Sequence, residues 1–317
     1  MSQNQPTVFV AIANYRDKEV TSTINDLLRQ ATRPDLIRIG VLSQVMADDD
    51  CCAPAHPQVE EIVIDAATSQ GVCWARSRLY QEMLGDEAFI LQIDSHMRFE
   101  PGWDKRLFAM WEQCQNPKAI ISHYPLGYKP PNHLPNKEIT VLKPGKFNLG
   151  GTLVYQSDTY PYNDRPESPI PSAFFSGNFL YTPASALKEV PYDPKLYFFG
   201  EEITMSVRLW THGWDFYAPN DVLAYHNYGK QTARPRHWDD HATVEQLEAR
   251  SVDRIQYLLT GREPLNDESL EDIEHYSLGE QRALSDYEAM TKVDFQQQKI
   301  LETHYVKAGR PVRLFKA

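Results

Sequence analysis

The chain has 317 residues, 42% hydrophobic and 24% charged, and its formal charge is −11 because 43 acidic residues outnumber 32 basic ones. This balance is typical of a globular protein and not of a disordered one. The acidic charge argues against a protein whose main task is to bind a nucleic-acid backbone, because such binding depends on clustered Lys and Arg. No apolar run approaches the roughly 20 residues that span a bilayer, and no signal-peptide pattern is present. We therefore expect a soluble, cytoplasmic protein whose four cysteines are free thiols.

The first half of the chain alternates continuous apolar runs, which predict strands, with apolar residues at helical spacing. The predicted strands cover residues 7–13, 36–42, 61–65 and 88–93, and the predicted helices cover residues 19–30 and 72–84. This order is typical of an α/β domain with a mostly parallel sheet. Ligands of such sheets bind beyond the carboxyl ends of the strands, where the polar clusters 14–17 and 94–96 fall.

The second half of the chain is less regular. Residues 122–171 are rich in Pro, Gly, Tyr and Asn, which predicts long loops with short strands. After them we expect a helix over residues 201–210, strands over 215–219 and 222–226, and a helix over 244–259. We divide the chain into an α/β domain, residues 1–235, and a helical C-terminal extension packed on it, residues 236–317.

Asp94 and His96, directly after a buried strand, form the sharpest local motif. Residues two apart in a strand-end loop can point to the same side, so a carboxylate oxygen and an imidazole nitrogen can bind one divalent cation. A turn in which Asp94 caps the next segment explains the same short pattern equally well. A single His at a strand end is more often structural, so His226 becomes a third ligand only if the first two form a metal site.

Glu201 and Glu202 open a predicted helix. The helix dipole stabilises acidic residues in a first helical turn. The simpler interpretation is therefore that both residues are exposed acids, each contributing at most about 1 kcal/mol to the stability of the fold. The aromatic residues 196–199 before them could instead form the wall of a pocket.

Arg76 lies on the predicted helix before the Asp94 strand. An arginine on a helix is usually exposed to solvent, but a diphosphate bound nearby would offer phosphate oxygens with which the guanidinium could pair.

Two long stretches resemble one family. GVCWARSRLYQEMLGDEAFILQIDSHMRFEPGWD resembles the part of the polypeptide GalNAc transferases that runs from a G-x-x-x-x-R-x-R helix into a D-S-H motif. YFFGEEITMSVRLWTHGWDFYAPNDVLAYH resembles their Gly-Glu-Asn helix and closing His. VFVAIANYRDKEV, DSHMRF, ARSVDRIQYLL and HYSLGEQRALSDYEAMTKVDF resemble more closely the GlcNAc transferases that modify hydroxyproline in a cytoplasmic ubiquitin-ligase subunit, with their bacterial relatives. This closer resemblance spans residues 8–295.

The resemblance implies a GT-A fold and a retaining, metal-dependent transferase that uses a UDP-sugar. It implies Asp94, His96 and His226 as ligands of a divalent metal, which we expect to be Mn(II), and Glu201 with Glu202 as catalytic residues. The donor-binding residues that it implies are Ala13, Tyr15, Arg16, Arg76, Asp94, Ser95, Ser176, Gly177 and Asn178. Residues 176–178 replace the Gly-Gly donor-sugar loop of the mucin-type enzymes, and Glu202 replaces an Asn, so the sugar preference is open at this point.

The expected reaction is transfer of GlcNAc from UDP-GlcNAc to a hydroxyl group of a protein or peptide, on hydroxyproline, Ser or Thr. A UDP-sugar transferase acting on a glycan, a small molecule or a hydroxylated nucleobase is one alternative. A nucleotide-sugar binding module without turnover is another. We expect no membrane partner and disfavour nucleic acid, because the basic cluster Lys129, Lys137, Lys143 and Lys146 is modest and is expected to be a solvated loop.

Overall fold

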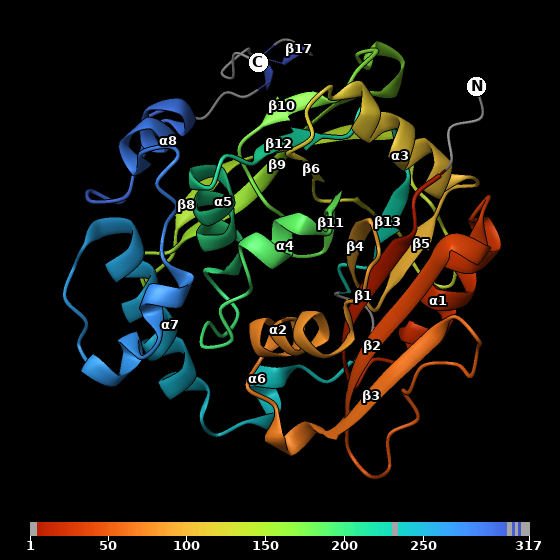
Figure 1. Cartoon of the computed structure of the whole chain (residues 1–317), viewed down its shortest axis with the longest axis horizontal. Coiled ribbons are helices and arrows are strands. Elements are labelled where there is room, and N and C mark those ends of the chain that lie inside the picture. Colours follow the sequence, from red (N-terminus) through yellow and green to blue (C-terminus); the bar gives the residue numbers. More distant parts are fainter. Residues whose placement is uncertain (1–4, 230–233, 303–305, 308–309, 312–317) are drawn as a thin grey trace.

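The computed structural model describes residues 5–229, 234–302, 306–307 and 310–311 (Figure 1). An eight-stranded sheet runs through its centre in the order β10-β12-β6-β11-β4-β1-β2-β3. Its strands are β1 (Val8–Tyr15), β2 (Ile37–Val45), β3 (Val59–Asp65), β4 (Phe89–Asp94), β6 (Ala119–Ser122), β10 (Ile170–Ser172), β11 (Phe179–Pro183) and β12 (Asp215–Ala218). β3, β2, β1 and β4 are mutually parallel, whereas β11 is antiparallel to β4 and β6. The predicted α/β class is confirmed.

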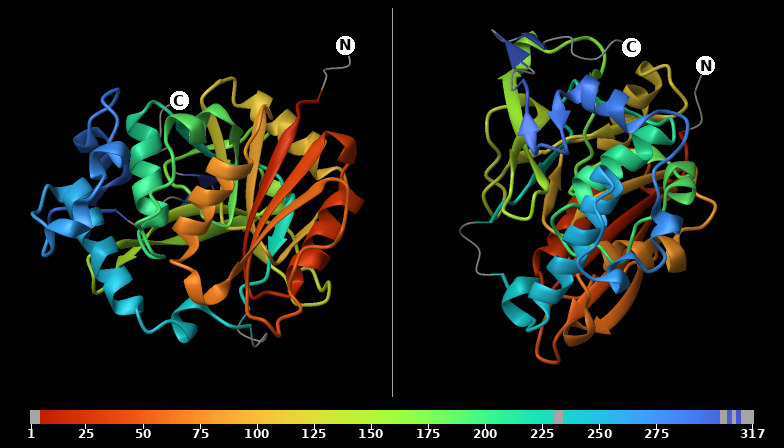
Figure 2. Two further views of the ribbon diagram at one scale, coloured as in Figure 1. Left: turned by 60° about the horizontal axis from the view of Figure 1, so that its bottom comes forward. Right: turned by 90° about the vertical axis from the view of Figure 1, so that its left-hand side faces the viewer.

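Helices cover both faces of this sheet (Figure 2). α1 (Glu19–Gln30) and α3 (Trp103–Gln113) lie on one face, and α2 (Val72–Met83), α4 (Ser185–Glu189) and α5 (Glu201–Thr211) lie on the other. The apolar run of β1 explains this layering, because its side chains alternate between two cores. Val8, Val10 and Ile12 pack with α1 and α3, while Phe9 and Ala11 pack with the α2 side.

A three-stranded sheet beside the central one carries part of the candidate site. In it β13 (Ala224–His226) lies between β5 (Met97–Phe99) and β7 (Leu126–Gly127). The strand expected over residues 222–226 thus begins only at Ala224 and lies outside the central sheet. His226 pairs with Met97, the residue that follows the 94–96 cluster.

The middle of the chain differs from the expectation of long loops with short strands. β8 (Glu138–Phe147) and β9 (Leu153–Pro161) form a long antiparallel hairpin. Pro144 and Gly145, which argue against a strand in the sequence, sit at a register shift between Pro144 and Lys146. Such a bulge accommodates a proline, and a Cβ at Gly145 would lie 2.7 Å from the Val154 carbonyl oxygen.

The C-terminal part of the chain is largely helical, as expected from residue 236 onward. It contains α6 (His237–Asp240), α7 (Val244–Thr260), α8 (Leu284–Thr291), the 3₁₀-helices η4 (Asp267–Leu270) and η5 (Ile273–Tyr276), and the short strands β14 (Val293–Asp294), β15 (Lys299–Ile300), β16 (Val306–Lys307) and β17 (Arg310–Pro311). Ile255, Leu259 and Tyr287 join the same hydrophobic core as α2 and α5. The division of the chain at residue 235 stays a prediction.

Three further 3₁₀-helices complete the described elements: η1 (Pro34–Leu36), η2 (Ala66–Thr68) and η3 (Tyr162–Asp164). Because η1 takes up Leu36, β2 begins one residue later than expected. None of the helices in the described part of the chain combines the length and hydrophobicity that a bilayer span requires.

Candidate active site

The ends of β1, β4 and β13 and the start of α5 converge on one cavity of about 420 Å³, a size typical of small-molecule sites. Its walls combine charged groups from the sheet edge with aromatic side chains. The lining includes Ala13, Tyr15, Asp17, Arg76, Asp94, Ser95, His96, Tyr124, Gly177, Asn178, Tyr197, Phe198, Phe199, Glu201, Glu202, His226, Tyr228, His237 and Trp238. The cavity therefore lies beyond the carboxyl ends of parallel strands, where α/β folds bind their ligands.

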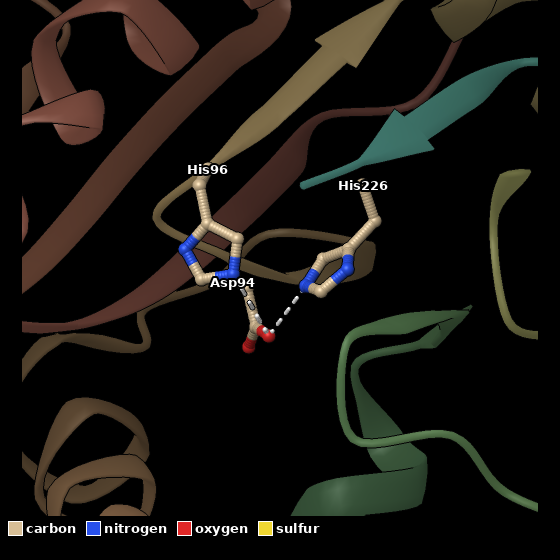
Figure 3. A group of neighbouring side chains, drawn as sticks. All are labelled: Asp94, His96 and His226. Atoms are coloured by element: carbon tan, nitrogen blue, oxygen red, sulfur yellow. Dashed lines mark hydrogen bonds and ion pairs between the residues drawn. The ribbon is translucent and has the colours of Figure 1, made fainter. Parts of the chain in front are cut away.

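Asp94, His96 and His226, which all line this cavity, point toward one another (Figure 3). One ligand atom from each residue lies within 4.8 Å of the other two. Asp94 Oδ2 is 3.0 Å from His226 Nε2 and 3.8 Å from His96 Nε2. Asp94 reaches this point from the last position of β4, and His226 from the last position of β13, which the pairing with β5 brings alongside.

The donor set fits a divalent metal. His96 Nε2 is buried and has no hydrogen-bond partner, as an imidazole nitrogen reserved for a cation would. Burial and the nearby His96 lower the pKa of His226 to about 4, so its imidazole is neutral and can act as a ligand at neutral pH. One carboxylate and two imidazoles suit a borderline ion such as Mn²⁺ or Zn²⁺.

Asp17 supports this cluster from behind. Its Oδ2 lies 2.7 Å from His96 Nδ1, and it also accepts a hydrogen bond of 2.9 Å from the Ser95 hydroxyl. Burial raises the pKa of Asp17, but the hydrogen bond with His96 outweighs burial and lowers the pKa to about 2. An ionised carboxylate on Nδ1 favours the tautomer that leaves Nε2 free to bind a metal.

Arg76 connects this cluster to the start of α5. The Arg76 side chain is 4% exposed. It donates a hydrogen bond of 2.8 Å to Asp94 Oδ1 and another hydrogen bond to Glu201 Oε1. Burial raises the pKa of Asp94, but the His226 hydrogen bond and the Arg76 charge outweigh it, so the pKa lies below its ordinary value. Glu201 is buried, which corrects the interpretation of an exposed helix-start acid.

Glu202 contacts the loop around Gly177, which faces Glu201. Its Oε1 accepts a hydrogen bond of 3.1 Å from the Gly177 backbone N–H, and its Oε2 accepts a hydrogen bond from the Tyr124 hydroxyl. Burial raises the pKa of Glu202 to about 7, although both hydrogen bonds favour the ionised form. A Cβ at Gly177 would lie 2.9 Å from Arg76 Nη1 and 3.0 Å from Glu201 Oε2, so a side chain there would displace the ends of this buried pair.

Most residues that the sequence assigns to donor binding lie on the cavity wall: Ala13, Tyr15, Arg76, Asp94, Ser95, Gly177 and Asn178. Two do not. Arg16 turns away and pairs with Asp49 at 2.7 Å and with Asp240 at 2.9 Å. Ser176 is fully buried, and its hydroxyl donates 2.6 Å to Asn178, so it supports the lining from behind.

Several residues of the site escaped the sequence analysis. Asp17 stands in the polar cluster 14–17, which is the one signal that could have found it. Tyr192 donates 2.7 Å to Glu201 Oε1 and has no motif around it. His237 and Trp238 line the cavity from the C-terminal extension. In the lysine cluster, Lys143 and Lys146 lie in β8 and not in a loop.

A family model described as "Glycosyltransferase (GlcNAc)" matches residues 7–58 and 53–297 of the chain. The chain belongs to this glycosyltransferase family. The match covers both the cavity and most of the C-terminal extension, so the two stretches that resemble transferases are parts of one family pattern. A comparison with curated protein sequences gives no significant match.

The fold also resembles that of a solved structure. GalNAc-T7, solved with UDP, GalNAc and Mn²⁺, superposes with a TM-score of 0.57 at 14% identity over 88% of this chain and 56% of that chain. This chain thus spans about half the length of GalNAc-T7. TarS 1-349 of S. aureus, solved with UDP-GlcNAc, gives a TM-score of 0.49 at 12% identity over 85% of this chain and 71% of that chain. The fold of this family member is GT-A, with a helical C-terminal extension.

Proposed function

We propose that this glycosyltransferase moves GlcNAc from UDP-GlcNAc to a hydroxyl group of a protein, with retention at the anomeric carbon. The observation that carries the proposal is the placement of two groups in one cavity: the Asp94, His96 and His226 cluster, and the Arg76–Glu201 pair beside Gly177. The description of the matched family supports GlcNAc as the sugar. The UDP, GalNAc and Mn²⁺ of the GalNAc-T7 structure are in keeping with a UDP-sugar and manganese.

In this proposal Asp94, His96 and His226 hold the metal together with the diphosphate of the donor. The metal, when bound, acts as a Lewis acid that neutralises the charge on departing UDP. Ala13 and Tyr15 at the end of β1 face the nucleotide. The Gly177 backbone faces the sugar, because it lies next to Glu201, and Asn178 follows it on the cavity wall.

The proposed reaction proceeds on one face of the sugar. The acceptor oxygen forms a bond to the anomeric carbon while the bond from that carbon to the β-phosphate oxygen breaks, and the acceptor proton passes to a phosphate oxygen of departing UDP. Glu201 orients the sugar and acceptor, since Arg76 and Tyr192 fix one of its oxygens. Glu202 keeps the Gly177 loop in place. A covalent glycosyl intermediate on Glu201 or Glu202 is the less favoured variant.

The rim of the cavity supports a protein acceptor. Phe198 and Phe199 are 40% and 47% exposed, and Trp238 contacts Phe198 at a ring-centroid distance of 5.2 Å. Exposed aromatic rings beside a reacting centre suit an extended peptide with prolyl-type rings. The formal charge of −11 argues against nucleic acid as the acceptor.

The four cysteines are free thiols, which is in keeping with the reducing environment of the cytoplasm.

A donor screen tests the proposal. Release of UDP is measured with Mn²⁺ and either UDP-GlcNAc, UDP-GalNAc, UDP-Glc or UDP-Gal, with Glu201→Gln as the inactive control. Turnover with UDP-GlcNAc above the others supports the donor, and preference for another sugar contradicts it. Binding of UDP without turnover of any donor indicates a binding module. The preferred donor is then offered hydroxylated peptides and hydroxymethylated DNA side by side; sugar incorporated into DNA overturns the protein acceptor.

A further inference from the structure

The loop between α4 and α5, residues 190–200, holds the carboxylate of Glu201. Tyr192, 2% exposed, donates its hydroxyl to Glu201 Oε1 at 2.7 Å, the same oxygen that Arg76 bonds. Burial and the Glu201 carboxylate raise the pKa of Tyr192 well above its ordinary value, so the hydroxyl remains a donor. With Oε1 occupied from two sides, Oε2 is the oxygen that faces Gly177.

This loop is itself held by α7 of the C-terminal extension. Asp193, 1% exposed, accepts 2.7 Å from Nε of the fully buried Arg254. Arg254 Nη1 also donates to the backbone carbonyls of Ser269 at 2.7 Å and Glu271 at 2.9 Å. A buried ion pair with these additional hydrogen bonds has one geometry, because any displacement leaves a desolvated charge without its partners.

Three more contacts continue along the same helix. Arg250 Nε donates 3.1 Å to the Lys195 carbonyl, and the Ser251 hydroxyl accepts from the Tyr197 backbone N–H at 2.5 Å. Ile255 packs so closely on Gly200 that a Cβ there would lie 2.0 Å from its Cδ1. Gly200, at a φ of 100°, is the residue directly before Glu201. α7 thus contacts the loop at four points up to the start of α5.

We infer that the C-terminal extension builds the active site: Arg254, through Asp193, positions Tyr192 against Glu201. Arg254, Asp193 and Tyr192 are positioning residues, since Arg254 and Asp193 lie outside the cavity lining and Tyr192 acts through Glu201. This inference rests on the proposed function, in which Glu201 contacts the sugar. It gives the extension a task that packing alone does not require.

The test compares Tyr192→Phe, Asp193→Asn, their double variant and Arg254→Lys with the wild type. Tyr155→Phe is the matched control, because Tyr155 is also buried and its hydroxyl contacts α5 at Ser206 Oγ, 2.9 Å away, outside the cavity lining. Three readouts are measured: kcat and KM for UDP-GlcNAc turnover, calorimetric affinities for UDP and UDP-GlcNAc with Mn²⁺, and Tm.

We expect Tyr192→Phe to lower kcat at least tenfold with UDP affinity unchanged, and to lose the extra affinity that the sugar gives UDP-GlcNAc over UDP. The double variant should lose no more than the stronger single variant, and Arg254→Lys should keep intermediate activity. Tyr155→Phe should retain the wild-type kcat.

Wild-type kcat and sugar-dependent affinity in both Tyr192→Phe and Arg254→Lys would overturn the inference. The inference would also be overturned if the losses of kcat in the single variants added up in the double variant and followed only the fall in Tm. A wild type that binds UDP-GlcNAc no better than UDP would overturn it as well. A wild type that turns over no donor contradicts the proposed function instead. The affinities of the variants then decide the inference on their own.

Discussion

Replacing Asp17 by Asn should perturb the candidate metal site without replacing any of its three candidate ligands. In the wild type Asp17 Oδ2 faces His96 Nδ1 at 2.7 Å, and Oδ1 accepts 3.0 Å from the Glu19 backbone N–H at the start of α1. An Asn that keeps the bond to Glu19 turns its NH₂ group toward His96. The imidazole must then accept at Nδ1 and carry its proton on Nε2, which blocks Nε2 as a ligand.

The size of the effect follows from the kind of contact. Loss of a carboxylate that supports a ligating His typically costs 10–100-fold in metal affinity, which is about 1.4–2.7 kcal/mol. We expect the upper half of this range, because Asp17 is 5% exposed and its charge is poorly screened by water. The assay is calorimetric titration of Mn²⁺ into the protein without UDP, with Tm measured for each variant.

Asp26→Asn provides the control. Asp26 is a buried carboxylate on α1 that accepts 2.7 Å from the Phe99 backbone N–H, and it contacts none of the three candidate ligands. The same change of charge there should leave Mn²⁺ affinity within twofold of the wild type. The reasoning is refuted if folded Asp17→Asn also binds Mn²⁺ within twofold, or if both variants lose affinity equally.

Three further predictions concern the other groups of the cavity. His226→Ala should stay folded and lose Mn²⁺ binding and Mn²⁺-dependent turnover; unchanged metal dependence would remove it from the site. Glu201→Gln should lower turnover per folded molecule at least 100-fold, whereas Tm should fall modestly because an amide still accepts from Arg76; full activity would contradict its role. Since burial raises the pKa of Glu202 from 4.5 to about 7, its neutral form stabilises the fold below pH 4.5, and this contribution is lost as the pH rises through 7. The free energy of unfolding of the wild type should therefore fall across pH 4.5–7, by on the order of 1–3 kcal/mol relative to Glu202→Gln, and equal pH profiles in chemical denaturation would contradict this.

Elements whose signal is local could be predicted from the sequence. β1 and α1 follow from an apolar run and from helical spacing, and the structure places them within one or two residues of the expected bounds. The β8–β9 hairpin could not be predicted, because the bulge that admits Pro144 and Gly145 depends on the partner strand. Propensity describes a residue alone, whereas a bulge is a property of a pair of strands.

The candidate site divides in the same way. Asp94 and His96 form a short motif, but the arrival of His226 depends on the pairing of β13 with β5, about 130 residues away in the sequence. The sequence assigns Arg16 to donor binding and gives Asp17 no role. In the structure Arg16 pairs with acidic residues outside the cavity lining, and Asp17 contacts His96. Arg16 has a left-handed φ of 50°, so the chain turns after β1, and it is Asp17 that faces the cluster. Strand alternation cannot anticipate a residue in that conformation.

The two departures from the transferase pattern lie in direct contact. Glu202 stands where the resembling enzymes carry Asn, and Gly177 lies in the triplet that replaces their Gly-Gly loop. In the structure Glu202 Oε1 accepts the Gly177 N–H at 3.1 Å, and the same glycine packs against Arg76 and Glu201. An Asn at position 202 has a shorter side chain than Glu, so it would not reach the Gly177 N–H from the same backbone position. The two departures therefore form a single contact on the cavity wall, beside Arg76 and Glu201.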